Sequence, residues 1–80
     1  MIKEYRKKST VKAIKFTENN RSEIIKTLIE NDVNFIECEK LIIINTKSGD
    51  QKLFMYDYLI ISDEIHPCTY EYFNKNYMEV

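Results

Sequence analysis

The alternation of apolar and polar positions divides the chain into short strands around one principal helix. Residues 10–16 (TVKAIKF) combine β-branched content with near-alternation, and the phase shift between Ala13 and Ile14 predicts a bulge or burial on both faces. Four consecutive Leu/Ile residues at 41–44 predict a strand that is covered on both sides. Other strands are expected over residues 1–8 (an arm or short edge strand), 33–38, 51–56, 58–62, 65–66 (ended by Pro67) and 77–80.

Apolar residues at helical spacing predict the principal helix. They fall at i, i+1, i+4 and i+5 and form one stripe: Ile24, Ile25, Leu28 and Ile29. Asn20 is expected to cap this helix, with Glu23 at capping-box spacing, and Asn31-Asp32 to end it. A second, short helix is expected over Tyr70 to Lys75, capped by Thr69.

Together these elements predict an α+β domain, in which a small antiparallel sheet of about five strands packs on one main helix, with a short C-terminal helix added. Residues 47–50 supply a hairpin turn, where Gly49, the only glycine, is free to adopt a positive φ. A chain of 80 residues and 9.7 kDa is expected to form a single domain, 1–80. Its core is expected to be thin.

The net charge of −1 hides an uneven distribution, since residues 1–15 carry +5 and the rest −6. The basic end fits either an anion-attracting patch or a basic strand paired with an acidic neighbour. Nonspecific duplex DNA binding is not expected, because such domains usually carry a net positive charge. No secretory signal and no long apolar run are apparent, so a membrane segment is not expected and both thiols are expected to be reduced.

Few catalytic or metal-binding arrangements can be built from the side chains present. His66 and Cys68 could converge as a dyad, but no glycine-rich oxyanion loop accompanies them, so a structural pair is the expected role. A zinc site from His66, Cys68 and Cys38 would lack Cys-x-x-Cys spacing. Asp63 and Glu64 are expected to be solvated turn residues. We therefore predict no enzyme activity, no metal and no cofactor.

Two features fit ligand binding. The segment Tyr5-Arg6-Lys7-Lys8 places an aromatic ring beside three cations, which suits a phosphate and a stacked base, or else a solvated basic arm. Tyrosine is also dense in the second half of the chain: Tyr56, Tyr58, Tyr70, Tyr72 and Tyr77. These residues fit either a subunit or ligand interface or packing on the hairpin's outer face.

The two ends of the chain resemble a family of small phage and prophage proteins. The amino-terminal likeness runs from Tyr5-Arg6-Lys7-Lys8 through Val11 and Ala13 to Phe16-Thr17. The carboxyl-terminal likeness covers Asp57-Tyr58-Leu59-Ile60, His66-Pro67-Cys68, Tyr72-Phe73 and Tyr77-Met78-Glu79. The chain departs from the family pattern at Ser9 (usually Pro), Tyr56 (usually Gly), His66 (usually aromatic) and from Thr69 onward, where the usual Lys-Pro is missing.

The resemblance implies a phage-encoded accessory protein acting in the host cytoplasm. On this basis the chain is expected to antagonise host defence by sequestering a nucleotide-derived signal between subunits of a homo-oligomer. The expected ligand-binding residues are Tyr5, Arg6, Lys7, Lys8, Tyr58 and Tyr72. Two alternatives stay open: a protein inhibitor of a host effector such as a CRISPR nuclease, whose basic groove would take the acidic body of the chain, and a minor morphogenetic protein.

Overall fold

The structure, a computed structural model, describes residues 2–6 and 10–79 and contains two antiparallel sheets and two helices. In chain order the elements are β1 (Lys3–Arg6), β2 (Thr10–Lys15), α1 (Arg21–Glu30), β3 (Phe35–Glu37), β4 (Leu41–Thr46), β5 (Gly49–Phe54), β6 (Tyr58–Ile61), β7 (Ile65–Cys68), α2 (Tyr70–Asn76) and β8 (Met78–Glu79). The predicted α+β class is confirmed. No helix in the described part of the chain is long and apolar enough to cross a membrane.

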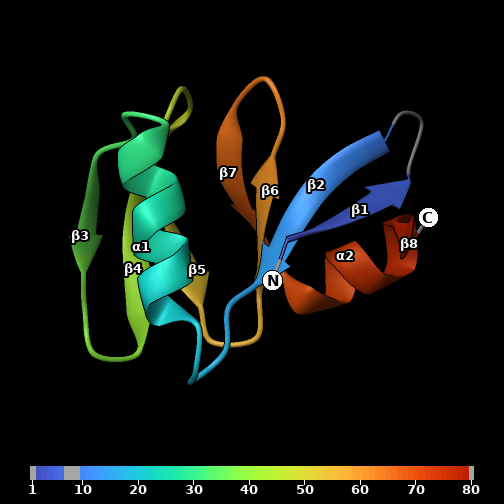
Figure 1. The fold of residues 1–80 in the computed structure, drawn as a ribbon, viewed down its shortest axis with the longest axis horizontal. Coiled ribbons are helices and arrows are strands. Elements are labelled where there is room, and N and C mark those ends of the chain that lie inside the picture. Colours follow the sequence, from blue (N-terminus) through green and yellow to red (C-terminus); the bar gives the residue numbers. More distant parts are fainter. Residues whose placement is uncertain (1, 7–9, 80) are drawn as a thin grey trace.

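The expected single sheet is wrong, because the strands divide between two sheets. One has five strands in the order β7-β6-β2-β1-β8, and the other has three in the order β3-β4-β5 (Figure 1). In the described part of the chain the middle strands pair with their sequence neighbours, β3 with β4 and β4 with β5. Their apolar side chains then face the larger sheet instead of extending it, which buries more surface than one open sheet would.

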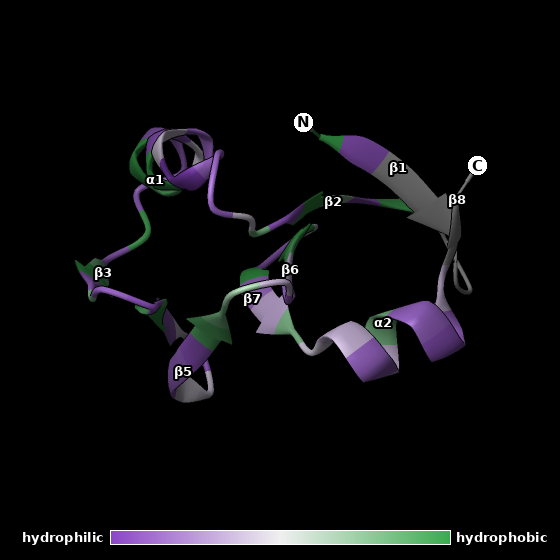
Figure 2. Cartoon of the chain, turned by 90° about the horizontal axis from the view of Figure 1, so that it is seen from below, coloured by the Kyte–Doolittle hydropathy of each residue, from purple (hydrophilic) through white to green (hydrophobic). Residues whose placement is uncertain are grey.

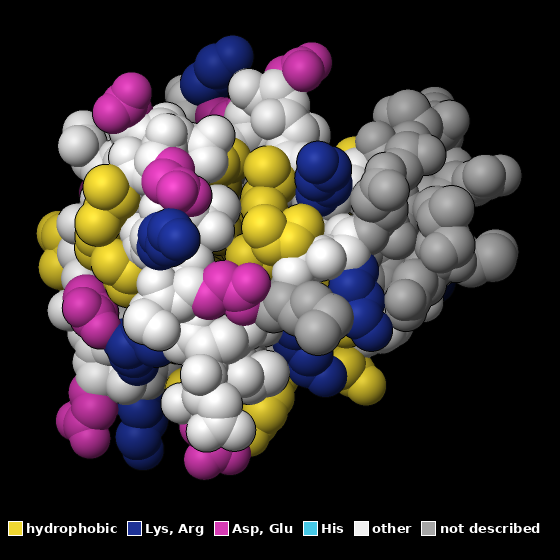
Figure 3. Space-filling view, in the orientation of Figure 1, with side chains coloured by type: hydrophobic (Ala, Val, Ile, Leu, Met, Phe, Trp, Pro, Cys, Tyr) yellow, Lys and Arg dark blue, Asp and Glu magenta, His cyan; other side chains and the backbone are white. Residues whose placement is uncertain are grey.

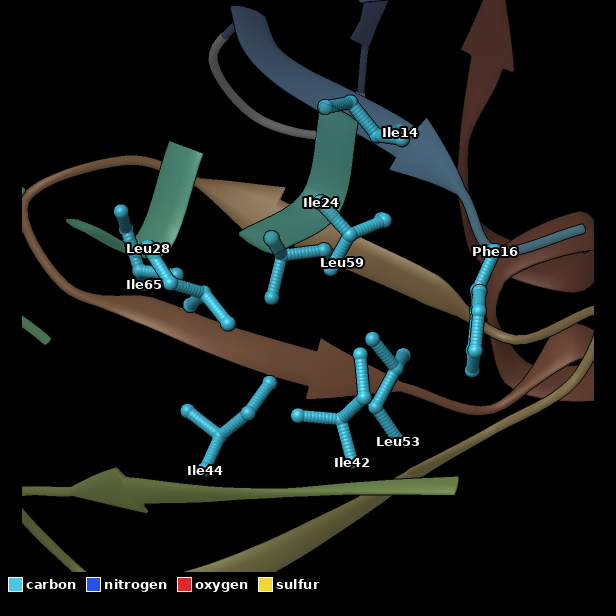
Figure 4. Close-up of a cluster of buried hydrophobic side chains, with 9 residues drawn as sticks. All are labelled: Ile14, Phe16, Ile24, Leu28, Ile42, Ile44, Leu53, Leu59 and Ile65. Carbon is cyan, nitrogen blue, oxygen red and sulfur yellow. The ribbon is translucent and has the colours of Figure 1, made fainter. Parts of the chain in front are cut away.

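The main core lies where α1, the three-stranded sheet and one face of the five-stranded sheet meet (Figure 4). Its fully buried members come from all three parts: Ile14, Phe16, Ile24, Leu28, Ile42, Ile44, Leu53 and Leu59. Ile65 on β7 joins them. This cluster fills the space between the two sheets and is their main apolar contact, to which a hydrogen bond from the Lys47 backbone N–H to Glu64 is added.

A second, smaller core covers the opposite face of the five-stranded sheet, where α2 packs (Figure 2). It contains Ala13, Tyr58, Ile60 and Phe73. Neighbouring residues on β2 and β6 thus enter different cores, as Ala13 and Ile14 do. The register from Lys12 to Lys15 against β6 is continuous, so the phase shift in the sequence reflects two-sided burial and not a bulge.

The amino terminus of α1 differs from the predicted capping box. Asn20 occupies the N-cap position, but its side chain makes no capping hydrogen bond. Its amide instead accepts a hydrogen bond from the Thr17 backbone N–H at 2.8 Å and donates one to the Lys15 carbonyl at 2.6 Å. Asn20 therefore fixes the turn between β2 and α1, because that turn offers two partners and the helix end offers one.

The carboxyl terminus of α1 ends where the sequence predicts. The backbone N–H of Val33 donates to the Leu28 carbonyl at 2.9 Å and that of Asp32 to the Ile29 carbonyl at 3.1 Å, which is the Schellman pattern. Asp32 has a φ of 56°, in the left-handed region. Val33 packs against the main core beside Leu28.

We expect Asp32→Gly to stabilise the protein, because glycine adopts a left-handed conformation without the steric cost that a Cβ brings. The expected gain is about 0.5–1 kcal/mol in the free energy of unfolding. Urea denaturation of the variant and the wild type measures it. Asp32→Ala is the control and should not be stabilised; an equal gain in both variants would contradict the backbone explanation.

Pro67 does not end the seventh strand, contrary to the sequence-based expectation. β7 continues through Pro67, which pairs with Leu59, to Cys68. β7 is the edge strand of its sheet, where a residue without a backbone N–H can be accommodated. The hairpin turn behaves as expected, since Gly49 has a φ of 103° at the start of β5.

Candidate ligand-binding site

Four residues from separate segments meet at one end of the five-stranded sheet, and we call them the Lys15 cluster: Lys15, Tyr56, Tyr58 and Tyr70. Lys15 is the last residue of β2, Tyr58 the first of β6 and Tyr70 the first of α2, and these ends lie close together (Figure 1). The Lys15 Nζ lies 5.0 Å from the centroid of the Tyr70 ring, 5.9 Å from that of Tyr56 and 6.0 Å from that of Tyr58. One ammonium group is thus surrounded by three aromatic rings.

Backbone hydrogen bonds bring the end of β2 against the β5–β6 turn. The Phe16 N–H donates to the Asp57 carbonyl at 2.8 Å, and the Tyr56 N–H donates to the Phe16 carbonyl at 2.6 Å. Tyr56 adopts a φ of 73°, a left-handed conformation that is uncommon for an aromatic residue. The turn is therefore held in a costly conformation that places the Tyr56 ring beside Lys15.

Two carboxylates hold the outer tyrosines of the cluster. The Tyr56 hydroxyl donates to Glu18 Oε1 at 3.2 Å, and Asp57 Oδ1 accepts from the Tyr70 backbone N–H at 2.9 Å. Asp57 thereby satisfies a free N–H at the start of α2, where a negative charge is favourable. The hydrogen bond to Glu18, with the repulsion from its charge, raises the pKa of Tyr56 above its ordinary value of 10.0.

Both outer rings remain accessible. Tyr56 is 48% exposed and Tyr70 is 49% exposed. Lys15 makes no ion pair with any carboxylate in the described part of the chain. The cluster therefore presents one cation and two aromatic faces to solvent, which is a set of groups suited to an anion that carries a ring.

The predicted ligand residue Tyr58 lies in the second core and is only 7% exposed. Its ring stacks on that of Phe73 with centroids 3.7 Å apart, and Phe73 stacks in turn on Tyr77 at 4.7 Å. A base has no open ring face of Tyr58 to stack on. Tyr58 belongs to the floor of the Lys15 cluster and not to its exposed surface.

The basic segment is only partly described. Lys7 and Lys8 lie outside the described residues, and Tyr5 and Arg6 are described by their backbone, which forms part of β1. There Arg6 pairs with Thr10 and Met78, so the predicted arm runs inside the sheet, between β2 and β8. Thr10 and Lys15 are at opposite ends of β2, about 17 Å apart at 3.3–3.4 Å per residue. The backbone of Tyr5 and Arg6 therefore lies toward the end of β2 that is opposite to the Lys15 cluster.

Tyr72 lies in a separate hollow of 530 Å³ beside the edge strand β7. Residues of β7, of α2 and of the two ends of α2 line it: His66, Pro67, Cys68, Thr69, Tyr72 and Tyr77. The His66 Nδ1 lies 3.2 Å from the Pro67 carbonyl oxygen, and the Cys68 Sγ contacts the carbonyl of Thr69. Cys38 follows β3 in the other sheet, and no disulfide bond joins Cys38 to Cys68. Among the described residues, no group of three His, Cys, Asp or Glu side chains could hold a metal ion.

Sequence reasoning missed Lys15 and did not select Tyr56 and Tyr70. The available signal was the density of tyrosines, which correctly indicated that some of them lie at the surface: Tyr56, Tyr70 and Tyr72 are each about half exposed. Which ones do so depends on the contact of the β5–β6 turn with the end of β2. That contact joins residues far apart in the sequence, so no local sequence pattern indicates it.

No family model, curated protein or solved structure matches this chain. The likeness of its two ends to small phage proteins accordingly stays a prediction.

Proposed function

We propose that the chain is a binding protein without catalytic activity, and that the Lys15 cluster takes a nucleotide-like anion. The observation that carries the proposal is the Lys15 ammonium, which makes no ion pair within the described residues and is held among three tyrosine rings, two of them half exposed. The three N–H donors of Lys15 suit a phosphate, and Tyr56 and Tyr70 suit a base.

The rings contribute to phosphate binding as well as to base stacking. A surface lysine normally loses rotamer entropy when it binds an anion. Lys15 is already restrained by its ring contacts, and Tyr70 and Tyr56 are restrained in turn by Asp57 and Glu18. A site whose groups are held in place before binding loses less entropy on binding.

In this proposal the biological role is the one that the phage resemblance implies. The protein would sequester a nucleotide-derived signal and thereby antagonise a host defence, in the host cytoplasm. The proposed role is binding and not turnover, with Lys15 donating to a phosphate and the exposed rings stacking on a base.

Titration calorimetry with AMP, adenosine and inorganic phosphate tests the site. AMP should bind more tightly than either fragment, because only AMP has both the charge and the ring. Lys15→Met keeps the aliphatic stem among the rings and removes the charge, and should weaken AMP binding about tenfold or more. Added salt should weaken wild-type binding and have little effect on the variant. The same measurement with a panel of linear and cyclic nucleotides then ranks these ligands by affinity.

Lys40→Met is the matched control, because Lys40 is exposed on the β3–β4 connection, away from the cluster. It should leave AMP binding unchanged. Tyr70→Leu should weaken AMP and adenosine but not phosphate. No detectable binding of any nucleotide, or equal affinity in Lys15→Met and wild type, would rule out the proposal.

A second candidate function is inhibition of a host effector protein by the acidic body of the chain. Residues 16–80 carry a net charge of −6, which suits a basic nucleic-acid groove, and exposed tyrosines are favoured at protein interfaces. Binding to a basic effector would survive Lys15→Met and weaken when exposed carboxylates are neutralised, so the same variant separates the two functions.

A further inference from the structure

An open groove of 720 Å³ lies along the outer side of α1, next to β3. Its lining combines apolar and charged side chains: Arg21, Ser22, Ile25, Lys26, Ile29, Glu30 and Glu37. Ile29 is 61% exposed although it belongs to the apolar stripe of the helix, and Ile36 on β3 is equally exposed. Figure 3 shows hydrophobic side chains on this side of the molecule, between charged ones.

The apolar stripe of α1 is wider than the core needs. Ile24 and Leu28 are fully buried in the main core, whereas Ile25 is half-buried and Ile29 faces solvent. Helical spacing places Ile25 and Ile29 one turn apart on the outer side. Ile25 and Ile29 therefore form an apolar strip along the groove, and exposed apolar surface of this kind can mark an interaction site. Ile36 lies on the opposite face of β3 from Glu37 and does not line the groove.

Arg21 fixes the shape of the groove. Its Nη1 atom lies 3.2 Å from Glu37 Oε2 and donates to the Cys38 carbonyl at 2.7 Å, and its Nη2 atom donates to the Glu39 carbonyl. Its guanidinium also lies 5.3 Å from the Phe16 ring centroid. These contacts tie the first turn of α1 to the end of β3, so the groove is present before any partner binds.

The charges around the groove balance. Lys26 and Glu30 lie on the side of α1 away from β3, and Arg21 and Glu37 lie on the β3 side, so each side has one cation and one anion. The rest of the body is acidic overall. A nucleic acid or a strongly charged partner needs a surface of one sign, whereas a surface with both signs on each side can match a rotated copy of itself.

We propose that this groove is the interface of a homodimer, in which the α1 helices of two copies pack antiparallel about a two-fold axis. The axis passes near the middle of the outer side of α1. Ile25 of each copy then packs against Ile29 of the other, and Lys26 of each faces Glu30 of the other. In the described part of the single chain, Lys26 and Glu30 make no ion pair, so both are available for this contact.

The dimer explains why Ile29 is left exposed in one chain. The contact is small, since α1 has only ten residues. We therefore expect a dissociation constant on the order of tens of micromolar. The inference is independent of the Lys15 cluster, because it uses none of the residues of that cluster.

Sedimentation equilibrium over the micromolar to millimolar range tests the dimer. Wild type should shift from 9.7 kDa toward twice that mass as the concentration rises. Ile29→Glu should weaken dimerisation about tenfold or more, since it places two charges in the apolar centre. Phe54→Glu is the control, because Phe54 is similarly apolar and 48% exposed but lies on β5; it should dimerise as wild type does.

Charge exchange tests the antiparallel arrangement itself. Lys26→Glu should weaken the dimer about fivefold or more, because it sets a carboxylate against Glu30 of the other copy at two symmetric places. The double variant Lys26→Glu with Glu30→Lys should restore wild-type affinity. Circular dichroism checks that each variant is folded.

Each other result overturns the proposal. If the wild-type protein stays monomeric up to millimolar concentration, the proposed dimer does not form. A dimer that Ile29→Glu leaves intact lies elsewhere on the surface. A double variant no stronger than Lys26→Glu alone excludes the antiparallel register.

Discussion

Replacing Phe73 with alanine is expected to lower the free energy of unfolding by about 3–5 kcal/mol. Phe73 is 1% exposed and its ring lies between those of Tyr58 and Tyr77, with centroid distances of 3.7 and 4.7 Å. It is the one fully buried side chain that α2 contributes among the described residues. Its loss therefore removes both the stacking and the main attachment of the helix.

The effect should be strongest in α2 and the adjoining face of the sheet, because Phe73 is absent from the main core. Urea denaturation gives the total loss, and amide hydrogen exchange shows where protection falls. Lys75→Ala on the solvent side of α2 is the control and should cost no more than about 0.5 kcal/mol. Uniform loss of protection in α1 and α2 would show that the two cores unfold as one unit.

The second large effect is expected at Leu53, where alanine should cost about 2–5 kcal/mol. Leu53 is fully buried and is the member of β5 in the main core. Among the described strands no ladder of hydrogen bonds joins the two sheets, so removing this side chain leaves a cavity in their main apolar contact.

Phe54→Ala is the matched comparison, since the neighbouring residue on β5 is 48% exposed on the other side of the strand. Thermal or urea denaturation should place Phe54→Ala well above Leu53→Ala in stability, although more atoms are removed. Equal losses would mean that the side of β5 facing the larger sheet had been assigned incorrectly.

The local elements could be predicted from the sequence because they depend on local chemistry. The hairpin at Gly49, the end of α1 at Asp32 and the Thr69 cap of α2, whose Oγ1 accepts from the Tyr72 N–H at 3.2 Å, are short-range features. The expected cover on both faces of strand 41–44 is found on one face only, since Ile42 and Ile44 are buried whereas Leu41 and Ile43 are partly exposed. The division into two sheets was not predictable either, because an apolar run does not specify which element covers it. That cover can come from a sheet or from a helix.

The sequence indicated that the candidate site contains aromatic rings, but not which residues supply them. Tyrosines in the second half of the chain indicated a surface with aromatic rings, but Tyr58 is buried and Tyr70 is exposed, which follows from where α2 begins relative to β6. The exposure of Ile29 was equally unpredictable from the sequence. Its helical spacing matches that of Leu28, and only the position of α1 on the core separates a buried residue from an exposed one.

The hydrogen bonds at Phe16, Tyr56 and Asp57 have a topological consequence. β2 and β6 are adjacent in the larger sheet. The chain between them forms α1 and the whole three-stranded sheet, and these hydrogen bonds join the point where it leaves β2 to the point where it enters β6. Segment 17–55 is therefore arranged as an inserted unit whose two ends touch. Connections at the far end of that unit, such as residues 31–34 and 47–48, can change in length without altering the register of β2 against β6.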